Sequence, residues 1–233
     1  MNTQPALERC LAFINCQLQP NARPPFASAT ARPRRAVTIS RQAGCGAHAI
    51  AEKLASYLQA AGPKESVPWT VWDRDLEKKV LQDHHLPQRL ARFMPEDHVS
   101  EMADIMEELC GLHPPSWILV RQTADTILHL AELGNVILIG RGSNIITTRL
   151  DHVFHVRLVG SLERRLGRVQ KSNHLSRKSA LKFIGLEDRG RRRYLKKYFG
   201  KNIDDPLLYH LVINTDLVSC EKAARIITDA VLG

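Results

Sequence analysis

The sequence predicts an α/β fold in which a parallel sheet is covered by helices on both faces. Short runs rich in β-branched residues alternate with amphipathic helical patterns along the chain, and one run, Val136–Ile139, is wholly apolar. Strands that alternate with helices form parallel sheets, because each crossover helix returns the chain to the same end of the sheet. A wholly apolar strand suits the centre of such a sheet, where both of its faces are buried.

The amino-terminal segment, residues 1–35, is predicted to be an extension outside the main domain at 36–233. Ala6–Leu18 has the apolar spacing of a short helix, and a linker rich in proline and arginine follows it up to residue 35. Packing of this helix against a partner or another protomer, the latter forming a homo-oligomer, and a loosely docked helix are the alternatives.

The first strand and the first helix of the domain are joined by glycines. Val37 and Ile39 are β-branched strand residues, and apolar residues recur at helical spacing from Gly46 until the Gly-Pro pair at 62–63. Such a junction presents unpaired backbone N–H groups at the positive end of a helix, which suits a phosphate. A tight turn that binds nothing is the alternative.

The junction resembles a degraded phosphate-binding loop. The usual pattern, G-x-x-x-x-G-K-[ST], supplies a lysine for the β- and γ-phosphates and a hydroxyl for Mg²⁺. When the sequence is aligned on Gly46, Arg41 replaces the first glycine, Ala47 the lysine and His48 the hydroxyl residue. The pattern alone therefore leaves phosphate binding and an ordinary turn open.

The next predicted strand lies within Trp69–Leu76 and ends in two carboxylates, Asp73 and Asp75. Open α/β sheets bind ligands at the carboxyl ends of their strands, so these carboxylates are candidates for a site. A helix N-cap is the competing interpretation for either residue. The histidines between Leu76 and Ser116 are scattered without metal-ligand spacing, and we predict no metal site there.

An arginine flanked by glycines follows the central strand. Ser116–Leu133 is predicted to be a long helix, and Gly140-Arg141-Gly142 comes directly after the strand at 136–139. The planar fork of arginine suits a phosphate, and the neighbouring glycines allow close approach, so we favour a binding role for Arg141 over that of a solvated turn residue.

The last third of the chain completes the alternation. Val153–Leu158 is predicted to be a strand, and a helix carrying several arginines follows Gly160-Ser161. Ser176 is the expected N-cap of a further helix. Leu211–Asn214 is the final predicted strand, and Glu221–Leu232 is a closing amphipathic helix.

Composition narrows the functional class. The 233 residues suit one domain with a hydrophobic core, without an apolar run of membrane-spanning length or an apolar signal region at the start. The five cysteines are odd in number and lack C-x-x-C spacing, so neither a disulfide framework nor a zinc site is predicted. We expect a cytoplasmic protein with no membrane partner.

The positive charge is concentrated in one segment. The net charge is +9, and Arg157–Lys201 contains fifteen Lys or Arg and three acidic residues, so this segment carries +12 and the rest of the chain −3. A nucleotide polyphosphate and a nucleic acid are the two candidate partners. Few aromatic residues interleave with the charges for base stacking, which disfavours a nucleic acid.

Five motifs occur together in one order: Thr38–Gly46, Trp72–Leu76, Ile139–Gly142, Asp188–Arg191 with Tyr194, and Tyr209–Thr215. Over about residues 36 to 232 they resemble the cytidylate-kinase-like family of P-loop proteins. The resemblance implies a P-loop NTPase-type three-layer sandwich with a five-stranded parallel sheet. It also implies a helical monophosphate-binding insertion at about 73–115 and an arginine-rich lid at about 170–200.

The same resemblance implies a nucleoside monophosphate kinase that uses ATP and Mg²⁺ and phosphorylates CMP or dCMP. Asp73 and Arg141 would bind the acceptor. Asp188 and Arg191 match the D-x-x-R motif of the lid, with Arg164 and Arg168 as further catalytic candidates beside Arg141. The ATP phosphates would lie on Ser40, Arg41, Gly44, Cys45, Gly46, Ala47 and His48.

Departures from the phosphate-loop pattern keep other hypotheses open. Without a hydroxyl at position 48, Mg²⁺ would rely on water, substrate phosphates and Asp73. The helix N-terminus beside Cys45 can lower a thiol pKa, which leaves a redox role as a minor alternative. A degenerate protein that binds a nucleotide without turnover is the main rival to a kinase, and a nucleic-acid-binding module is the second.

Overall fold

The computed structural model describes residues 34–62, 67–73 and 116–233. The predicted helix Ala6–Leu18 and nearly all of the predicted insertion at 73–115 lie outside the described residues. The described strands are β1 (Ala36–Arg41), β2 (Thr70–Trp72), β3 (Val136–Ile139), β4 (Val153–Val159) and β5 (Leu211–Asn214). They form one five-stranded sheet in the order β2-β3-β1-β4-β5, and every pairing is parallel. The predicted fold class is confirmed.

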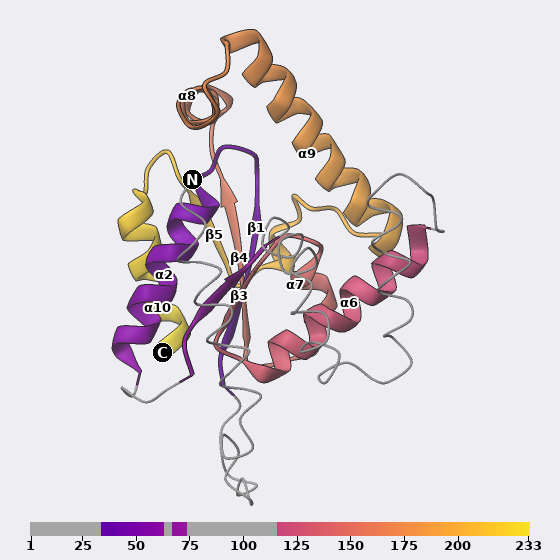
Figure 1. Cartoon of the computed structure of the whole chain (residues 1–233), viewed down its shortest axis with the longest axis vertical. Helices are drawn as coiled ribbons and strands as arrows, with labels where there is room; N and C mark the ends of the chain where they lie inside the picture. Colours follow the sequence, from indigo (N-terminus) through magenta and orange to yellow (C-terminus); the bar gives the residue numbers. More distant parts are fainter. Residues whose placement is uncertain (1–33, 63–66, 74–115) are drawn as a thin grey trace, which may run out of the picture.

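Helices cover both faces of this sheet. The described helices are α2 (Ala47–Ala61), α6 (Ser116–Leu133), α7 (Ser143–Ile146), α8 (Leu162–Asn173), α9 (Arg177–Phe199) and α10 (Cys220–Leu232), with a short 3-10 turn at Pro206–Leu208. Figure 1 shows α2 and α10 together on one face and α6 and α7 on the other. Within the described parts of the chain, none of these helices is both long and apolar enough to cross a membrane.

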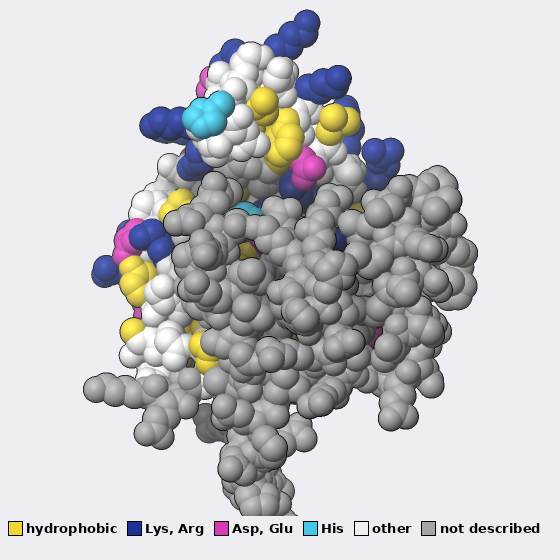
Figure 2. Space-filling view, in the orientation of Figure 1, with side chains coloured by type: hydrophobic (Ala, Val, Ile, Leu, Met, Phe, Trp, Pro, Cys, Tyr) yellow, Lys and Arg dark blue, Asp and Glu magenta, His cyan; other side chains and the backbone are white. Residues whose placement is uncertain are grey.

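The segment predicted as a lid at 170–200 comprises the end of α8 and the single long helix α9. Serine side chains cap both helices, because Ser161 accepts from the backbone N–H of Arg164 and Ser176 from that of Ser179. Figure 1 shows α9 running from α8 across the upper end of the sheet. Figure 2 shows Lys and Arg side chains projecting around this upper part of the molecule.

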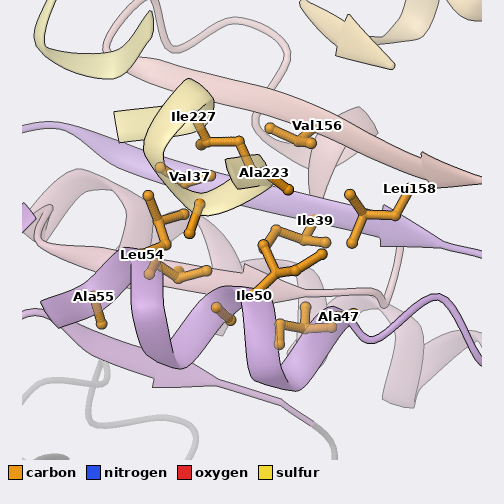
Figure 3. Packing of buried hydrophobic residues seen from close by; sticks show 14 of the residues in the cluster. Val37, Ile39, Ala47, Ile50, Leu54, Ala55, Val156, Leu158, Ala223 and Ile227 are labelled. Atoms are coloured by element: carbon orange, nitrogen blue, oxygen red, sulfur yellow. The ribbon is translucent and has the colours of Figure 1, made fainter. Parts of the chain in front are cut away.

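The larger core lies between the sheet and the α2–α10 pair (Figure 3). Val37 and Ile39 point to this face from β1, since alternate residues of a strand share a face. They meet Ile50 and Leu54 of α2 and Ile227 of α10, all fully buried. Each such side chain stabilises the fold by roughly 1.5–3 kcal/mol, so the strand and helix that flank the glycine junction are held firmly.

Packing on the opposite face of the sheet, toward α6, explains why Val136–Ile139 is uniformly apolar. Ile137 and Ile139 join the core under α2, whereas Val136 and Leu138 pack toward α6 with Ala131. The strand is thus buried on both sides, as expected for a central parallel strand. The junction after β1 and the turn after β3 are therefore held side by side at the carboxyl edge of the sheet.

Candidate active site

The junction between β1 and α2 has the geometry of an anion-binding loop. Gly44 and Gly46 have positive φ angles of 81° and 74°, which a glycine adopts without strain. A Cβ on Gly44 would lie 2.6 Å from the carbonyl oxygen of Arg165, so only glycine fits there. Among the described residues, no side chain caps the start of α2, and the first turn of this helix has no acidic residue. The residues present thus fit a phosphate at this helix end.

A cleft of about 210 Å³ lies between the carboxyl edge of the sheet and α9. Its polar lining includes Ser40, Arg41, Arg141, Asn144, Glu187 and Arg191, and Leu186, Leu195 and Ile203 add apolar surface. The structure thus brings together residues of the phosphate loop, the turn after β3 and the D-x-x-R motif, which are far apart in the sequence.

Three of the lining residues are arginines. Burial, followed by the nearby charge of Arg191, lowers the pKa of Arg41 to about 10, so this side chain is still charged at neutral pH. The Arg41 guanidinium lies against the backbone of Gly140, where a Cβ would collide with it. Arg141 is exposed and has a φ of 55°, in the left-handed region that side chains rarely adopt. Strain of this kind is often found at ligand sites.

Arg168 lies on the other side of the phosphate loop and is held by protein groups. Its Nη1 donates to the Gly44 carbonyl at 3.3 Å and to the Thr215 hydroxyl at 3.0 Å, and its Nη2 donates to the Thr215 carbonyl. Arg168 does not line the cleft. These hydrogen bonds favour a role in bracing the loop, and the predicted catalytic role stays a prediction.

Asp188 connects α9, the helix of the predicted lid, to the predicted phosphate loop between β1 and α2. Its carboxylate accepts from the backbone N–H of Ala43 at 2.7 Å and from Arg165 at 2.7 Å. Arg191 donates to the same carboxylate at 3.3 Å and to Glu187 at 2.6 Å. The two residues of the D-x-x-R motif therefore differ, because Asp188 holds the loop whereas Arg191 reaches the cleft.

Arg165, which the sequence does not distinguish from its neighbours, is the most firmly held of these arginines. It is buried and donates to the carbonyls of Gly160 and Ala43 as well as to Asp188. Arg164, a predicted catalytic residue, is exposed at the start of α8 and does not line the cleft. Neither arrangement could be inferred from the spacing of the arginines.

A buried network lies beneath Ser40. Arg157, which is 4% exposed, donates to the Ser40 hydroxyl at 3.0 Å and to Asp204 at 2.9 Å. The Tyr209 hydroxyl lies 3.3 Å from that of Ser40 and donates to the Ile203 carbonyl at 2.8 Å. Arg157 and Tyr209 were not predicted as site residues. The one signal for Arg157 was a charge within a strand that is apolar apart from His155.

His48, in α2, and Asp73, directly after β2, form a pair. The Nδ1 of His48 lies 3.1 Å from a carboxylate oxygen of Asp73. Asp73 and Arg141 line a second hollow of about 20 Å³, which has room for about one water molecule. Across the described ranges, no cluster of three or more His, Cys, Asp or Glu side chains could hold a metal ion.

Cys45 is buried in the loop. Burial raises the pKa of its thiol, while a hydrogen bond with Thr215 and the charges of Arg165 and Arg168 oppose that rise. The expectation that the helix N-terminus could lower this pKa is therefore wrong, because desolvation of the thiolate dominates. A buried thiol with a raised pKa is a poor nucleophile, which disfavours a redox role.

The sheet order, the glycine loop at the head of α2 and the arginine-lined cleft define a P-loop kinase-like α/β protein. The model of the cytidylate kinase-like family matches residues 36–217, and the chain belongs to this family. No curated protein matches the chain significantly.

Two solved structures are similar to this chain. An uncharacterized protein from Eubacterium ventriosum is 19% identical with a TM-score of 0.57, and the alignment covers 85% of this chain and 98% of that one. This similarity shows a shared fold. A shikimate kinase from Bacteroides thetaiotaomicron is 15% identical over 85% of this chain and 99% of its own, but its TM-score of 0.42 is too low to support an inference.

Proposed function

We propose that this protein transfers a phosphoryl group from ATP to a nucleoside monophosphate, with CMP and dCMP as the first acceptors to test. The observation that carries the proposal is the convergence of Arg41, Arg141 and Arg191 on one cleft, which Ser40 of the predicted loop also lines. Phosphoryl transfer depends on positioning and on neutralising charge, and this arrangement supplies both.

The ATP phosphates are assigned to the loop from Ser40 to His48, where no side chain in the described part of the chain caps the first amides of α2. Arg41 adds a fixed positive charge at the end of β1. Mg²⁺, when bound, neutralises charge on the phosphates. Asp73 is the protein carboxylate assigned to its shell, with water and phosphate oxygens as the remaining ligands.

Arg141 and Arg191 are assigned to the transferring and accepting groups. Arg141 follows the interior strand β3, so the sheet fixes its position, and its fork suits the acceptor phosphate. Arg191 comes from the lid helix and is oriented by Glu187 and Asp188. Asp188 and Arg165 hold that helix against the loop. Arg191 on the helix is thereby kept opposite the arginines at the edge of the sheet.

The test is formation of ADP and of a nucleoside diphosphate from ATP-Mg²⁺ and a panel of CMP, dCMP, UMP, AMP and GMP. We expect turnover with CMP or dCMP, and Arg141→Ala should lower it by about 100-fold or more. Arg149→Ala is the matched control, because Arg149 is exposed on the same connection and does not line the cleft. Equal turnover by the wild type and Arg141→Ala would contradict the assignment.

A nucleotide-binding protein without turnover is the second candidate function. The observation in its favour is His48, which stands in place of the usual hydroxyl residue. His48 pairs with Asp73, the carboxylate that the kinase proposal assigns to Mg²⁺. ATP binding without formation of any nucleoside diphosphate would select this candidate. The cytoplasmic location and the homo-oligomer formed through residues 1–35 also stay predictions.

A further inference from the structure

The carboxylate of Asp204 joins α9 to the sheet. Asp204 lies on the segment that leads from the end of α9 to β5 (Figure 1). One of its oxygens accepts from Arg157 of β4 at 2.9 Å, and the other accepts from Nε of Arg192 of α9 at 3.0 Å. The backbone N–H of Asp204 donates to the side chain of Asn202 at 3.1 Å, which helps to hold the turn that carries it. A single side chain thus links two elements that are distant in the sequence.

The link is firmly anchored on the side of the sheet. The Arg157 side chain is 4% exposed and also donates to the hydroxyl of Ser40, a residue of the cleft lining. A buried guanidinium needs a counter-charge, and within the described part of the chain Arg157 pairs with the carboxylate of Asp204. Asp204 is therefore held at a fixed place beside one wall of the cleft.

The link is exposed on the side of α9. Arg192 is 52% exposed and Asp204 41% exposed, so the ion pair between them adds little to stability and is screened by salt. Its place on α9 gives this pair a second effect. Arg192 directly follows Arg191, about 100° further around the helix, and lies one turn after Asp188, which ties α9 to the predicted phosphate loop. Two ties one turn apart on the same face of α9 restrict rotation of the helix about its axis.

We propose that Asp204 is a positioning residue that, through Arg192, fixes the rotation of α9 at which Arg191 reaches the cleft. This inference rests on the proposed function. Asp204 does not line the cleft, so its effect on the reaction passes through the helix. Displacement of a catalytic group by about 1 Å can cost roughly 100-fold in rate, so a weak, exposed pair can matter more to turnover than to stability.

The main test is Arg192→Ala, because this change releases α9 and leaves the pair of Asp204 with the buried Arg157 intact. With ATP-Mg²⁺ and CMP, kcat should fall about 10-fold while the KM for CMP stays within about twofold. The Tm should stay within about 2 °C of the wild-type value. Hydrogen exchange, measured by mass spectrometry, should become faster in the second half of α9. Arg192→Lys keeps the charge and should regain part of the lost kcat.

Arg177→Ala is the matched control, because Arg177 forms an exposed ion pair at the other end of α9 that reaches Glu163 of α8 instead of the sheet. It should leave kcat within about twofold and exchange in the second half of α9 unchanged. Asp204→Asn tests the carboxylate itself. Adding Arg192→Ala to Asp204→Asn should lower kcat no further, since both changes remove the same tie. A further loss of about threefold or more would overturn the shared role.

Turnover separates this inference from the proposed function. If the wild type phosphorylates CMP and Arg192→Ala keeps its kcat, the kinase stands and the positioning role falls. A loss of kcat with unchanged exchange in α9 also overturns the positioning role, because Arg192 would then act directly. If α9 responds to Arg192→Ala and not to Arg177→Ala, but the wild type phosphorylates none of CMP, dCMP, UMP, AMP and GMP, the kinase falls and the hold of Asp204 on α9 stands.

Discussion

The molecule contains two sets of arginines that look alike in the sequence and differ in their surroundings. The cleft set, Arg41, Arg141 and Arg191, lines the space beside α9. The bracing set, Arg165 and Arg168, lies against the other side of the phosphate loop and donates to backbone carbonyls, Asp188 and Thr215. The comparison shows that the partner of an arginine, rather than the density of arginines, decides its role.

The two sets also differ in what they do to stability. A buried guanidinium with several acceptors holds its neighbours in place, and its loss leaves those acceptors unpaired. A cation kept beside like charges destabilises the fold but is preorganised for an anionic ligand. The lowered pKa of Arg41, caused first by burial and then by Arg191, is the sign of the second situation. Each prediction below tests one side of this contrast.

The largest effect is expected at Arg165. Arg165→Ala should lower the free energy of unfolding by about 3–5 kcal/mol, because it leaves the carboxylate of Asp188 partly buried without its main cation. Chemical denaturation followed by circular dichroism measures this loss. Arg177→Ala, which removes an exposed pair with Glu163, should leave stability unchanged. A stable Arg165→Ala variant would remove Arg165 from the bracing set.

Arg191 should show the opposite behaviour. Arg191→Ala should lower kcat by about 100- to 1000-fold through lost charge stabilisation. Its ion pairs with Glu187 and Asp188 are only partly buried, with the Arg191 side chain 22% exposed, and should contribute about 1 kcal/mol to stability. Steady-state kinetics and thermal unfolding on one preparation check both numbers. If stability falls in proportion to activity, Arg191 belongs with the bracing arginines.

Arg41 should give a smaller effect of opposite sign on stability. Its pKa in the folded protein is lowered to about 10, mainly by burial, so the fold disfavours the charged form relative to the unfolded chain. Arg41→Met should therefore raise the free energy of unfolding by about 1–3 kcal/mol and raise the KM for ATP. Arg41→Lys retains a charge and should give less of the stability gain. A destabilised Arg41→Met variant would show that Arg41 is structural.

The smallest effect is expected at Arg164. This side chain is exposed and outside the cleft, so Arg164→Ala should change stability by less than about 0.5 kcal/mol. We expect kcat to stay within about twofold of the wild-type value. A kcat loss of about 10-fold or more would instead show that movement of α8 and α9 brings Arg164 to the phosphates.

Periodicity was sufficient to predict the sheet and most helix bounds. Ser116–Leu133 and Val136–Ile139 have the predicted bounds because amphipathic spacing and a continuous apolar run are local signals. The short helix α7 was not predicted, since four residues give no period to recognise.

The candidate site was predicted only where a motif marks it. Gly44, Gly46 and Arg141 stand in recognisable local patterns, and the structure places all three at the carboxyl edge of the sheet. The partners of Arg165 and Arg157 come from distant parts of the chain, as in the hydrogen bond from Arg165 to Ala43, 122 positions away. Asn144 gave no signal at all, because its place in the cleft lining is visible only once the chain is folded.

The most direct test is to measure kcat/KM and the free energy of unfolding for Arg141→Ala and Arg168→Ala under the same conditions. Arg141→Ala should lose about 100-fold or more in kcat/KM with stability unchanged within about 0.5 kcal/mol. Arg168→Ala should lose about 1–3 kcal/mol of stability and less than about 10-fold in kcat/KM. If Arg168→Ala instead loses activity as strongly as Arg141→Ala while remaining fully stable, the division into cleft and bracing arginines is wrong.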